Sequence, residues 1–416
     1  MSARIETISD VVGRGAVHPF PARMAPGIAL SAISSAPRKL RVLDPMMGSG
    51  TVLAVARAQG HQAFGADLDP LAVLITRVWT TPIDREAVIN VAENVLRNAK
   101  DHFRDLRAGN AYPKGATEET KKFIRYWFDP YARRQLTALS LKISRIKCEK
   151  NRNVLWCAFS RLIITKQAGA SRAMDLSHSR PHRAFLYAPT KPFNLFLRTV
   201  ERVLESTIST KDKARGPKTA IYEADARQLP IRSDTIDLVL TSPPYLNAID
   251  YIRCSKFTLV WMGHSIQQLR ELRAISVGAE IGADKNAHAE VKNILNRIDS
   301  KKKLDSRLRS ILARYVLDMK IAMNETARVL APNGRAIYVV GENTLRGTYI
   351  KTSEILSVLA EQIGLELIGM TSRNLPSNRR YLPPPRRNKH GMIHSRMRKE
   401  VIISFRKTAH SRSVGR

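Results

Sequence analysis

The chain has 416 residues, with 69 lysines and arginines against 36 aspartates and glutamates, a formal net charge of +33 and a pI near 10.6. This length accommodates a sizeable core plus an inserted domain, and the basic excess favours a polyanionic partner. The sequence has three cysteines, which form no Cys-x-x-Cys pair and have no histidines at zinc spacing, so disulfides and a metal site are not expected. No apolar run approaches membrane-spanning length.

The first predicted unit is a strand, a glycine loop and a helix. Arg41–Asp44 is an apolar strand ending in an acid, and the loop Gly48-Ser49-Gly50-Thr51 leads into an Ala/Val-rich helix. The glycines let backbone approach a ligand, and the helix start presents unpaired N–H groups. A second strand, Gln62–Ala66, ends at Asp67, where doubly wound folds place a ribose-binding carboxylate. Neither a P-loop lysine nor Gly-x-Gly-x-x-Gly is present, so we expect a nucleoside ligand without a pyrophosphate.

The stretch 107–218 is predicted to be a basic insertion. Its pattern predicts a helix from Tyr126 to about Ile146, and either a helix or a strand over Val154–Ile164. Residues 170–183 interleave hydroxyls, imidazoles and guanidiniums, as a loop that contacts bases and phosphates would; an ordinary solvated loop has the same composition. The candidate nucleic-acid contacts here are Arg172, His178 and Arg180.

After residue 219 the sheet is predicted to resume. The predicted strands are Ala220–Tyr222, Ile236–Leu240, Ala336–Val340, Leu365–Gly369 and Val401–Phe405, and the predicted helices are Leu308–Val329 and Thr352–Ile363. A turn is expected at Pro332–Gly334. The connection before the last strand is proline-rich and basic, and we expect it either to clamp phosphates or to be a loop without a ligand. Its candidate contacts are Arg379, Arg380, Arg386 and Arg387.

The tetrad Ser242-Pro243-Pro244-Tyr245 follows the strand Ile236–Leu240 and Thr241. The two prolines have no N–H and a fixed φ, so this loop holds carbonyl acceptors rigidly, while Ser242 adds a hydroxyl and Tyr245 a flat ring. Such a loop suits the exocyclic amine of adenine or cytosine, because two fixed acceptors favour the electron-rich nitrogen needed for attack. Alone, the tetrad is equally compatible with a polyproline turn; the glycine loop and its acid are an independent second signal.

The positive charge is concentrated in two segments. Residues 107–218 carry 24 Lys and Arg against 8 Asp and Glu, and residues 373–416 carry 13 against 1. The rest of the chain, which holds both candidate ligand loops, has a net charge of only +5. This clustering favours nucleic-acid contact over a generically basic surface or an unstructured tail.

Together these motifs resemble those of the amino-specific DNA methyltransferases, which use S-adenosylmethionine. The resemblance also includes the segments His18–Arg23, Glu223–Ala226, Asp250–Trp261 and Arg396–Glu400. It implies a catalytic loop of Ser242, Pro243, Pro244 and Tyr245. It implies cofactor contacts from Phe20, Pro21, Asp44, Gly48, Ser49, Gly50, Thr51, Asp67, Asp225 and Thr241, with Asp67 at the ribose and Asp225 at the adenine. Met46 stands where the family usually has Phe.

The resemblance implies a doubly wound Rossmann-like α/β sheet, mostly parallel with an antiparallel C-terminal strand and interrupted by a largely helical basic insertion. The expected units are a cofactor half (1–106), the insertion as candidate target recognition (107–218), a catalytic half (219–372), and a basic loop, last strand and tail (373–416). Methyl transfer to a base flipped out of double-stranded DNA is the implied reaction. Serine at the head of the tetrad favours cytosine N4, and adenine N6 remains open as the target.

An RNA methyltransferase and a non-enzymatic DNA-binding protein of the same fold compete with this interpretation. The resemblance further implies a monomer or dimer in the prokaryotic cytoplasm, at the nucleoid. A cognate restriction endonuclease is an expected partner if the chain belongs to a restriction-modification system.

Overall fold

The computed structural model describes most of the chain. The described residues are 7–21, 23–34, 36–166, 168–174, 176, 181–211, 216–246, 251–278, 291–292, 294, 306–345, 348–374 and 399–408.

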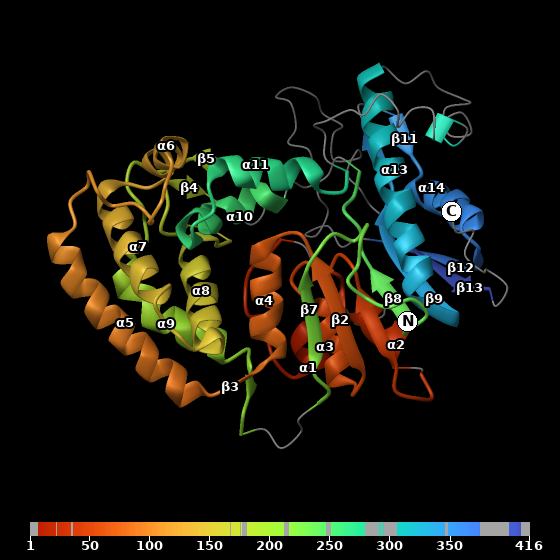
Figure 1. Ribbon diagram of the computed structural model, residues 1–416, viewed down its shortest axis with the longest axis horizontal. Coiled ribbons are helices and arrows are strands. Elements are labelled where there is room, and N and C mark those ends of the chain that lie inside the picture. The colour runs from red at the N-terminus through yellow and green to blue at the C-terminus, as the bar shows by residue number, and fades with distance from the viewer. Residues whose placement is uncertain are drawn as a thin grey trace.

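A seven-stranded sheet forms the centre of one half of the molecule, in the order β12-β13-β9-β8-β1-β2-β7 (Figure 1). Its strands are β1 (Arg41–Asp44), β2 (Gln62–Asp67), β7 (Thr219–Glu223), β8 (Ile236–Thr241), β9 (Leu330–Gly341), β12 (Leu365–Asn374) and β13 (Lys399–Lys407). Neighbouring strands from β7 to β9 pair in parallel, whereas β13 is antiparallel to both of its neighbours. The predicted mostly parallel sheet with an antiparallel C-terminal strand is therefore confirmed.

Helices cover both faces of this sheet, because alternate strand residues point to opposite sides. In β8, Leu238 and Leu240 belong to one core, and Val239 belongs to the other. The first core is covered by α1 (Ile8–Val12), α2 (Pro26–Ile33), α3 (Thr51–Ala58) and α4 (Pro70–Thr80). The second is covered by α13 (Ser306–Val329) and α14 (Thr352–Gln362). The sheet is thus doubly wound, as expected.

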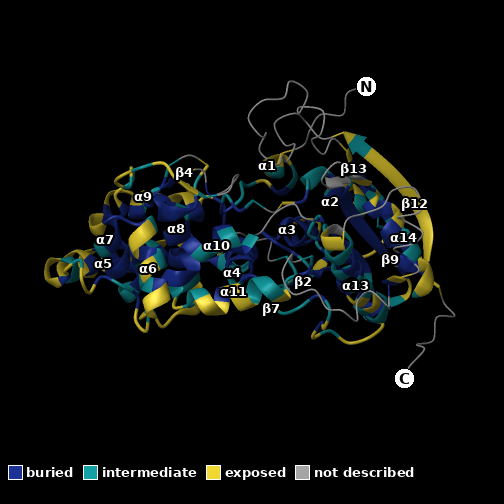
Figure 2. Cartoon of the chain, turned by 90° about the horizontal axis from the view of Figure 1, so that it is seen from above, coloured by how far each residue is buried: buried dark blue, intermediate teal, exposed yellow. Residues whose placement is uncertain are grey.

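Two predicted boundaries near β9 and β12 differ from the structure. The predicted turn at Pro332–Gly334 lies inside β9 as an irregularity, because Ile236 pairs with Leu330 whereas Leu238 pairs with Arg335. Strand β12 continues five residues beyond the predicted end at Gly369, since β13 pairs with it as far as Asn374. Figure 2 shows this outer strand exposed along most of its length.

A helical lobe lies beside the sheet (Figure 1). It consists of α5 (Arg85–Asp105), α6 (Glu118–Trp127), α7 (Pro130–Ile143), α8 (Glu149–Ile163) and α9 (Pro192–Leu204), with the short pair β4 (Ala173–Met174) and β5 (His182–Arg183). The chain enters and leaves it through β3 (Pro82–Ile83) and β6 (Ile208–Ser209), which pair in parallel. Helix α5, which the sequence placed in the cofactor half, packs against α7 and α9 of this lobe.

The predicted continuous helix from Tyr126 is wrong, because the chain leaves the helical conformation at Phe128 and Asp129. The Asp129 carboxylate caps α7 by accepting from the amides of Tyr131 and Ala132 at 3.0 and 3.1 Å, and Pro130 takes the first helical position, where no N–H is needed. The ambiguous run from Val154 is helical and belongs to α8.

Helices after β8 bridge the sheet and the lobe. They are α10 (Tyr251–Leu259), the 3-10 helix η1 (Val260–Met262) and α11 (Ile266–Ile275). Helix α10 packs on both α4 and α8, and α11 packs on α6. The remaining strands, β10 (Asn343–Leu345) and β11 (Thr348–Ile350), form a separate hairpin. Within the described residues, no helix is long and apolar enough to span a bilayer.

Candidate active site

The two candidate ligand loops meet where the strand order of the sheet reverses. Strand β1 lies between β2 and β8, so the loops after β1 and β8 leave neighbouring strands at the same edge. The Thr241 hydroxyl donates to Asp44 Oδ1 at 2.7 Å, and both side chains are buried. Doubly wound sheets bind ligands at this switch point. Residues that are 197 positions apart are thus joined at the switch point, where the ligand crevice of a doubly wound sheet is expected.

The glycine loop is tightly packed at Gly50. Gly48 and Gly50 have φ angles of +50° and +81°, the left-handed region that favours glycine. A Cβ atom at Gly50 would lie 2.6 Å from the Thr76 side chain, whose hydroxyl donates to the Gly48 carbonyl at 3.2 Å. Gly50 is the N-cap of α3 and has no side chain, so no capping side chain accepts from the first backbone N–H groups of this helix. Ser49 and Thr51 are buried on either side of it.

The Asp67 carboxylate holds the glycine loop from the end of β2. Its Oδ2 accepts from the Gly48 amide at 2.8 Å, and its Oδ1 accepts from the Asp69 amide at 2.9 Å. Burial raises the pKa of Asp67, and these amide bonds oppose that rise. The Leu68 amide also hydrogen-bonds this carboxylate, so part of its capacity to accept from ligand hydroxyls is already used.

Two further carboxyl groups near the crevice are strongly perturbed. Burial raises the pKa of Asp44 to about 7, although the bonds from the Thr241 hydroxyl and the Met46 amide lower it. Burial also raises the pKa of Asp69 to about 7, with the neighbouring Asp67 charge contributing. Asp69 caps α4 and accepts from the Ser255 hydroxyl on α10, so it joins the first half of the sheet to the bridging helices.

The segment around Phe20 is held between the sheet and the lobe. Phe20 is buried and stacks on Tyr251 at the start of α10, with ring centroids 6.4 Å apart. His18 Nε2 and the Ser160 hydroxyl of α8 are 2.9 Å apart, and Ser160 lies at the same distance from the Thr258 hydroxyl of α10. Burial is the main cause that lowers the pKa of His18 well below its ordinary value, so the imidazole is neutral. Pro21 follows Phe20 and is partly exposed.

Asp225 lies on the turn after β7, beside Asp67, since the Ala224 amide donates to the Asp67 carbonyl at 3.1 Å. Its carboxylate is already paired with Arg227, whose Nη2 lies 2.7 Å from Asp225 Oδ2. Arg227 also contacts the buried Asp318 of α13 at 2.6 Å. The structure therefore brings Asp225 close to the crevice, but with less acceptor capacity than the sequence alone implied.

The tetrad after β8 is fixed through its tyrosine. Tyr245 donates from its hydroxyl to Glu400 Oε1 of β13 at 2.9 Å, and Ser242 also hydrogen-bonds that hydroxyl. Glu400 Oε2 accepts from Arg373 of β12 at 2.8 and 2.6 Å. Burial, with the Glu400 charge next, raises the pKa of Tyr245 well above its ordinary value, so the phenol stays protonated and donates. Pro243 is buried.

Sequence reasoning missed Arg373 and named Glu400 only as the end of a basic segment. The signal that identifies them is strand register: they are direct cross-strand partners in the β12–β13 ladder. That register is not readable from either strand alone.

The predicted nucleic-acid contacts are only partly described. Arg172 lies at the end of α6, where its Nη1 approaches the carbonyls of Arg125 and Tyr126 at 3.4 and 3.5 Å, so it supports this corner of the lobe. The other candidates lie outside the described residues: His178, Arg180, Arg379, Arg380, Arg386 and Arg387.

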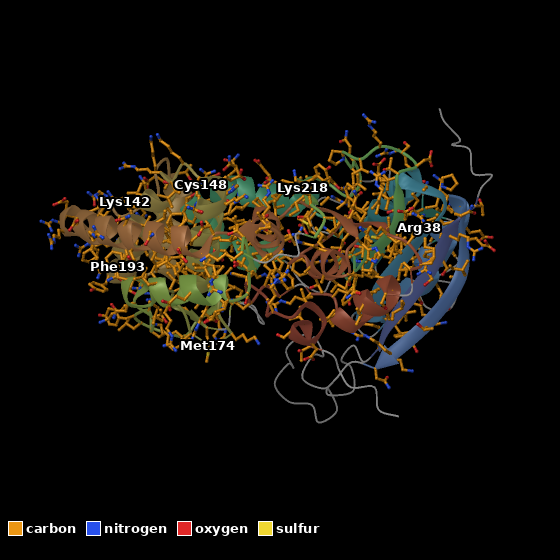
Figure 3. The ribbon with its side chains drawn as sticks, turned by 90° about the horizontal axis from the view of Figure 1, so that it is seen from below. Arg38, Lys142, Cys148, Met174, Phe193 and Lys218 are labelled. Carbon is orange, nitrogen blue, oxygen red and sulfur yellow. The ribbon has the colours of Figure 1, made fainter. Side chains whose placement is uncertain are left out.

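The sequence did not single out an exposed aromatic corner of the lobe. The segments around residues 174 and 187 lie against the turn between α6 and α7, because the Arg172 amide donates to the Trp127 carbonyl and the Ala188 amide donates to Asp129 Oδ2. The large exposed apolar side chains of these segments are Tyr126, Tyr131, Met174, Leu186 and Tyr187. Arg183 lies over the Tyr126 ring at 5.6 Å, and Lys191 over the Tyr131 ring at 5.7 Å. Figure 3 shows Met174 at the rim of the lobe. We call this surface the aromatic corner.

Across the part of the chain that the structure describes, no cluster of His, Cys, Asp and Glu is arranged to hold a metal ion.

The fold is that of a doubly wound α/β protein whose two candidate ligand loops meet at the switch point of the sheet. The chain is similar along its length to Type II methyltransferases. It is 24% identical to the Type II methyltransferase M.MvaI of Kocuria varians, over 94% of this chain and 90% of the relative. It is 22% identical to M.AvaI of Nostoc sp., over 79% of this chain and 73% of that relative. No family model matches the chain.

Among solved structures, a TehB-like SAM-dependent methyltransferase from Corynebacterium glutamicum aligns with 95% of this chain and 90% of its own, at 11% identity and a TM-score of 0.30. A putative DNA modification methylase from Thermus thermophilus aligns with 46% of this chain and 56% of its own, at 16% identity and a TM-score of 0.24.

Proposed function

We propose that this protein is a site-specific DNA methyltransferase that transfers a methyl group from S-adenosylmethionine to the exocyclic amine of a flipped base. The observation that carries this proposal is the Thr241–Asp44 hydrogen bond, because it joins the glycine loop and the acceptor tetrad at one crevice. The similarity to a Type II methyltransferase over 94% of the chain supports the same reaction class.

The crevice residues fit a nucleoside cofactor. S-adenosylmethionine supplies an electrophilic methyl group on its sulfonium. Asp67 would accept from the two ribose hydroxyls, and Phe20 and Pro21 would cover the methionine portion. The uncapped start of α3 and the positive φ angles of Gly48 and Gly50 provide backbone donors at close approach. Asp225 is the proposed adenine contact, with Arg227 holding its carboxylate.

The acceptor tetrad would position the base. Tyr245 stacks on the extruded ring, while the Ser242 oxygen and the Pro243 carbonyl accept from the NH2 group. S-adenosylmethionine would supply the methyl group and leave as S-adenosylhomocysteine, while the tetrad would hold the amine nitrogen towards the methyl group and the amine would lose one proton to solvent. The protein contributes chiefly alignment of nitrogen, methyl and sulfur. We favour cytosine N4 as the acceptor because serine heads the tetrad, with adenine N6 as the alternative.

The DNA duplex would lie along the basic lobe. Residues 107–218 carry a net charge of +16, which suits a phosphate backbone. The aromatic corner adds exposed apolar and aromatic side chains next to Arg183 and Lys191, a combination suited to contact with bases as well as phosphates.

The test is transfer of labelled methyl from S-adenosylmethionine to long unmethylated DNA, followed by digestion and identification of the modified nucleoside. We expect N4-methylcytosine; N6-methyladenine would establish adenine as the target base. Transfer to structured RNA but not to DNA would reject the proposed substrate. If calorimetry detected no S-adenosylmethionine binding, the enzymatic proposal itself would fail.

Two variants separate the roles within the site. Tyr245→Ala should abolish transfer and leave cofactor affinity nearly intact, and unchanged turnover would reject the stacking role. Asp67→Ala should weaken cofactor binding, and an unaltered dissociation constant would remove Asp67 from the cofactor site.

A further inference from the structure

We propose that Glu400, held in place by Arg373, is a positioning residue that fixes the ring of Tyr245 before the target base arrives. This inference rests on the proposed function, because it assumes that Tyr245 stacks on the base. Glu400 touches neither substrate nor cofactor in this proposal, and acts only through the tyrosine hydroxyl.

The geometry links three strands of the sheet to the acceptor tetrad. Glu400 pairs with Arg373 on one side and with Gly341 of β9 on the other, so its backbone is fixed in a ladder. Its two oxygens have different partners: Oε1 accepts from Tyr245 at 2.9 Å, and Oε2 accepts from Arg373 at 2.8 and 2.6 Å. Both sides of the carboxylate are therefore restrained.

The negative charge of the Glu400 carboxylate strengthens the hydrogen bonds that hold the Tyr245 ring. Glu400 is 8% exposed, and its carboxylate accepts from a guanidinium and a phenol, so the hydrogen bonds are charge-assisted and stronger than neutral ones. The phenol remains a donor because burial and the Glu400 charge raise its pKa. Tyr245 therefore stays neutral and keeps donating to Glu400.

The consequence for catalysis is preorganisation. A tyrosine ring has two side-chain torsions, and anchoring its hydroxyl at the far end removes most of their freedom. An extruded base then meets a ring already in its stacking orientation, so less ordering remains to be done on binding. Loss of the anchor should therefore reduce the transfer step and leave cofactor affinity unchanged.

The test is a double-mutant cycle with Tyr245→Phe, Glu400→Ala and the combined variant. Phenylalanine keeps the stacking ring and removes only the hydroxyl. We expect each single change to lower kcat for methyl transfer about tenfold, and the combined variant to be no worse than either one. Glu400→Gln should recover part of the rate, because its amide oxygen still accepts from the phenol.

Two further measurements separate positioning from structural damage. The KM for S-adenosylmethionine should stay within about twofold in every variant, since the glycine loop is untouched. Glu366→Ala is the matched control: Glu366 is an exposed glutamate at the other end of the same β12–β13 ladder, and its loss should not change kcat.

The free energies of unfolding of the same four proteins give the coupling between Tyr245 and Glu400, and this measurement does not depend on enzymatic activity. Coupling in both stability and kcat supports the proposal. Coupling in stability with additive losses in kcat overturns the positioning role, and no coupling in stability overturns the contact itself. If the unmutated protein transfers no methyl group although the stability coupling is present, the proposed function fails and the positioning role fails with it.

Discussion

Replacing Asp44 by asparagine should remove a specific pH dependence of stability. Burial raises the pKa of the Asp44 carboxyl from 3.8 to about 7. The Asp44 carboxyl therefore binds its proton more tightly in the folded chain than in the unfolded chain. The protonated carboxyl contributes its full stabilisation of the fold below about pH 4, and this contribution is lost as the pH rises to 7. At about 1.4 kcal/mol per pKa unit, the loss is about 4 kcal/mol.

Asparagine keeps an oxygen that accepts from the Thr241 hydroxyl and the Met46 amide, but it cannot ionise. Urea unfolding of both proteins should be followed between pH 4.5 and 8, without cofactor. We expect the free energy of unfolding of Asp44→Asn, relative to the unmutated protein, to increase from pH 4.5 to about pH 7 and to level off above that. Asp105→Asn, the same change at an exposed position on α5, controls for the loss of one negative charge.

Parallel pH profiles for Asp44→Asn and the unmutated protein would refute this reasoning. They would mean that the Thr241 and Met46 bonds compensate the buried charge fully. A difference that decreased with pH would mean that Asp44 is stabilised as the anion, against the desolvation argument.

Three other changes test separate features, two by chemical unfolding and one by DNA binding. Gly50→Ala should destabilise the protein by about 2 kcal/mol or more, because the left-handed backbone and the Thr76 contact both oppose a Cβ atom; Gly60→Ala, with φ +80° and open space, should cost less. Asp129→Ala should lower the free energy of unfolding by about 2 kcal/mol, because it removes the cap of α7 and also the acceptor of the Ala188 amide. Asp84→Ala should lower it by about 1 kcal/mol, because the exposed Asp84 caps α5 with a single hydrogen bond. Arg183→Gln should weaken DNA binding and reduce the slope of log affinity against log salt by about one, as measured by fluorescence anisotropy; an unchanged slope would remove Arg183 from the phosphate contacts.

The sequence was most informative where structure is local. The strand, glycine loop and helix from Arg41 to Ala58 are encoded by consecutive residues, and so is the strand that precedes Thr241. The break at Phe128 was also readable, since Asp129-Pro130 is a typical helix start, but the apolar periodicity on both sides obscured it.

The contacts that join the site depend on strand register and could not be predicted. Thr241 meets Asp44 only because β8 lies beside β1, and Tyr245 meets Glu400 only because β13 inserts between β9 and β12. Arg227 illustrates a different limit: its pairing with Asp225 is local, but the motif resemblance drew attention to the acid alone.

The buried, hydrogen-bonded series His18, Ser160 and Thr258 makes the two sides of the lobe differ in how well they tolerate amino-acid substitutions. Ser160 of α8 contacts a segment proposed to cover the donor and a helix that follows the acceptor tetrad, so substitutions on this inner side disturb both halves of the crevice at once. Helix α5 lies on the far side from these contacts (Figure 1). Substitutions on the outer side of the lobe leave these contacts intact, whereas the side facing α10 must keep its shape for both halves to stay in place.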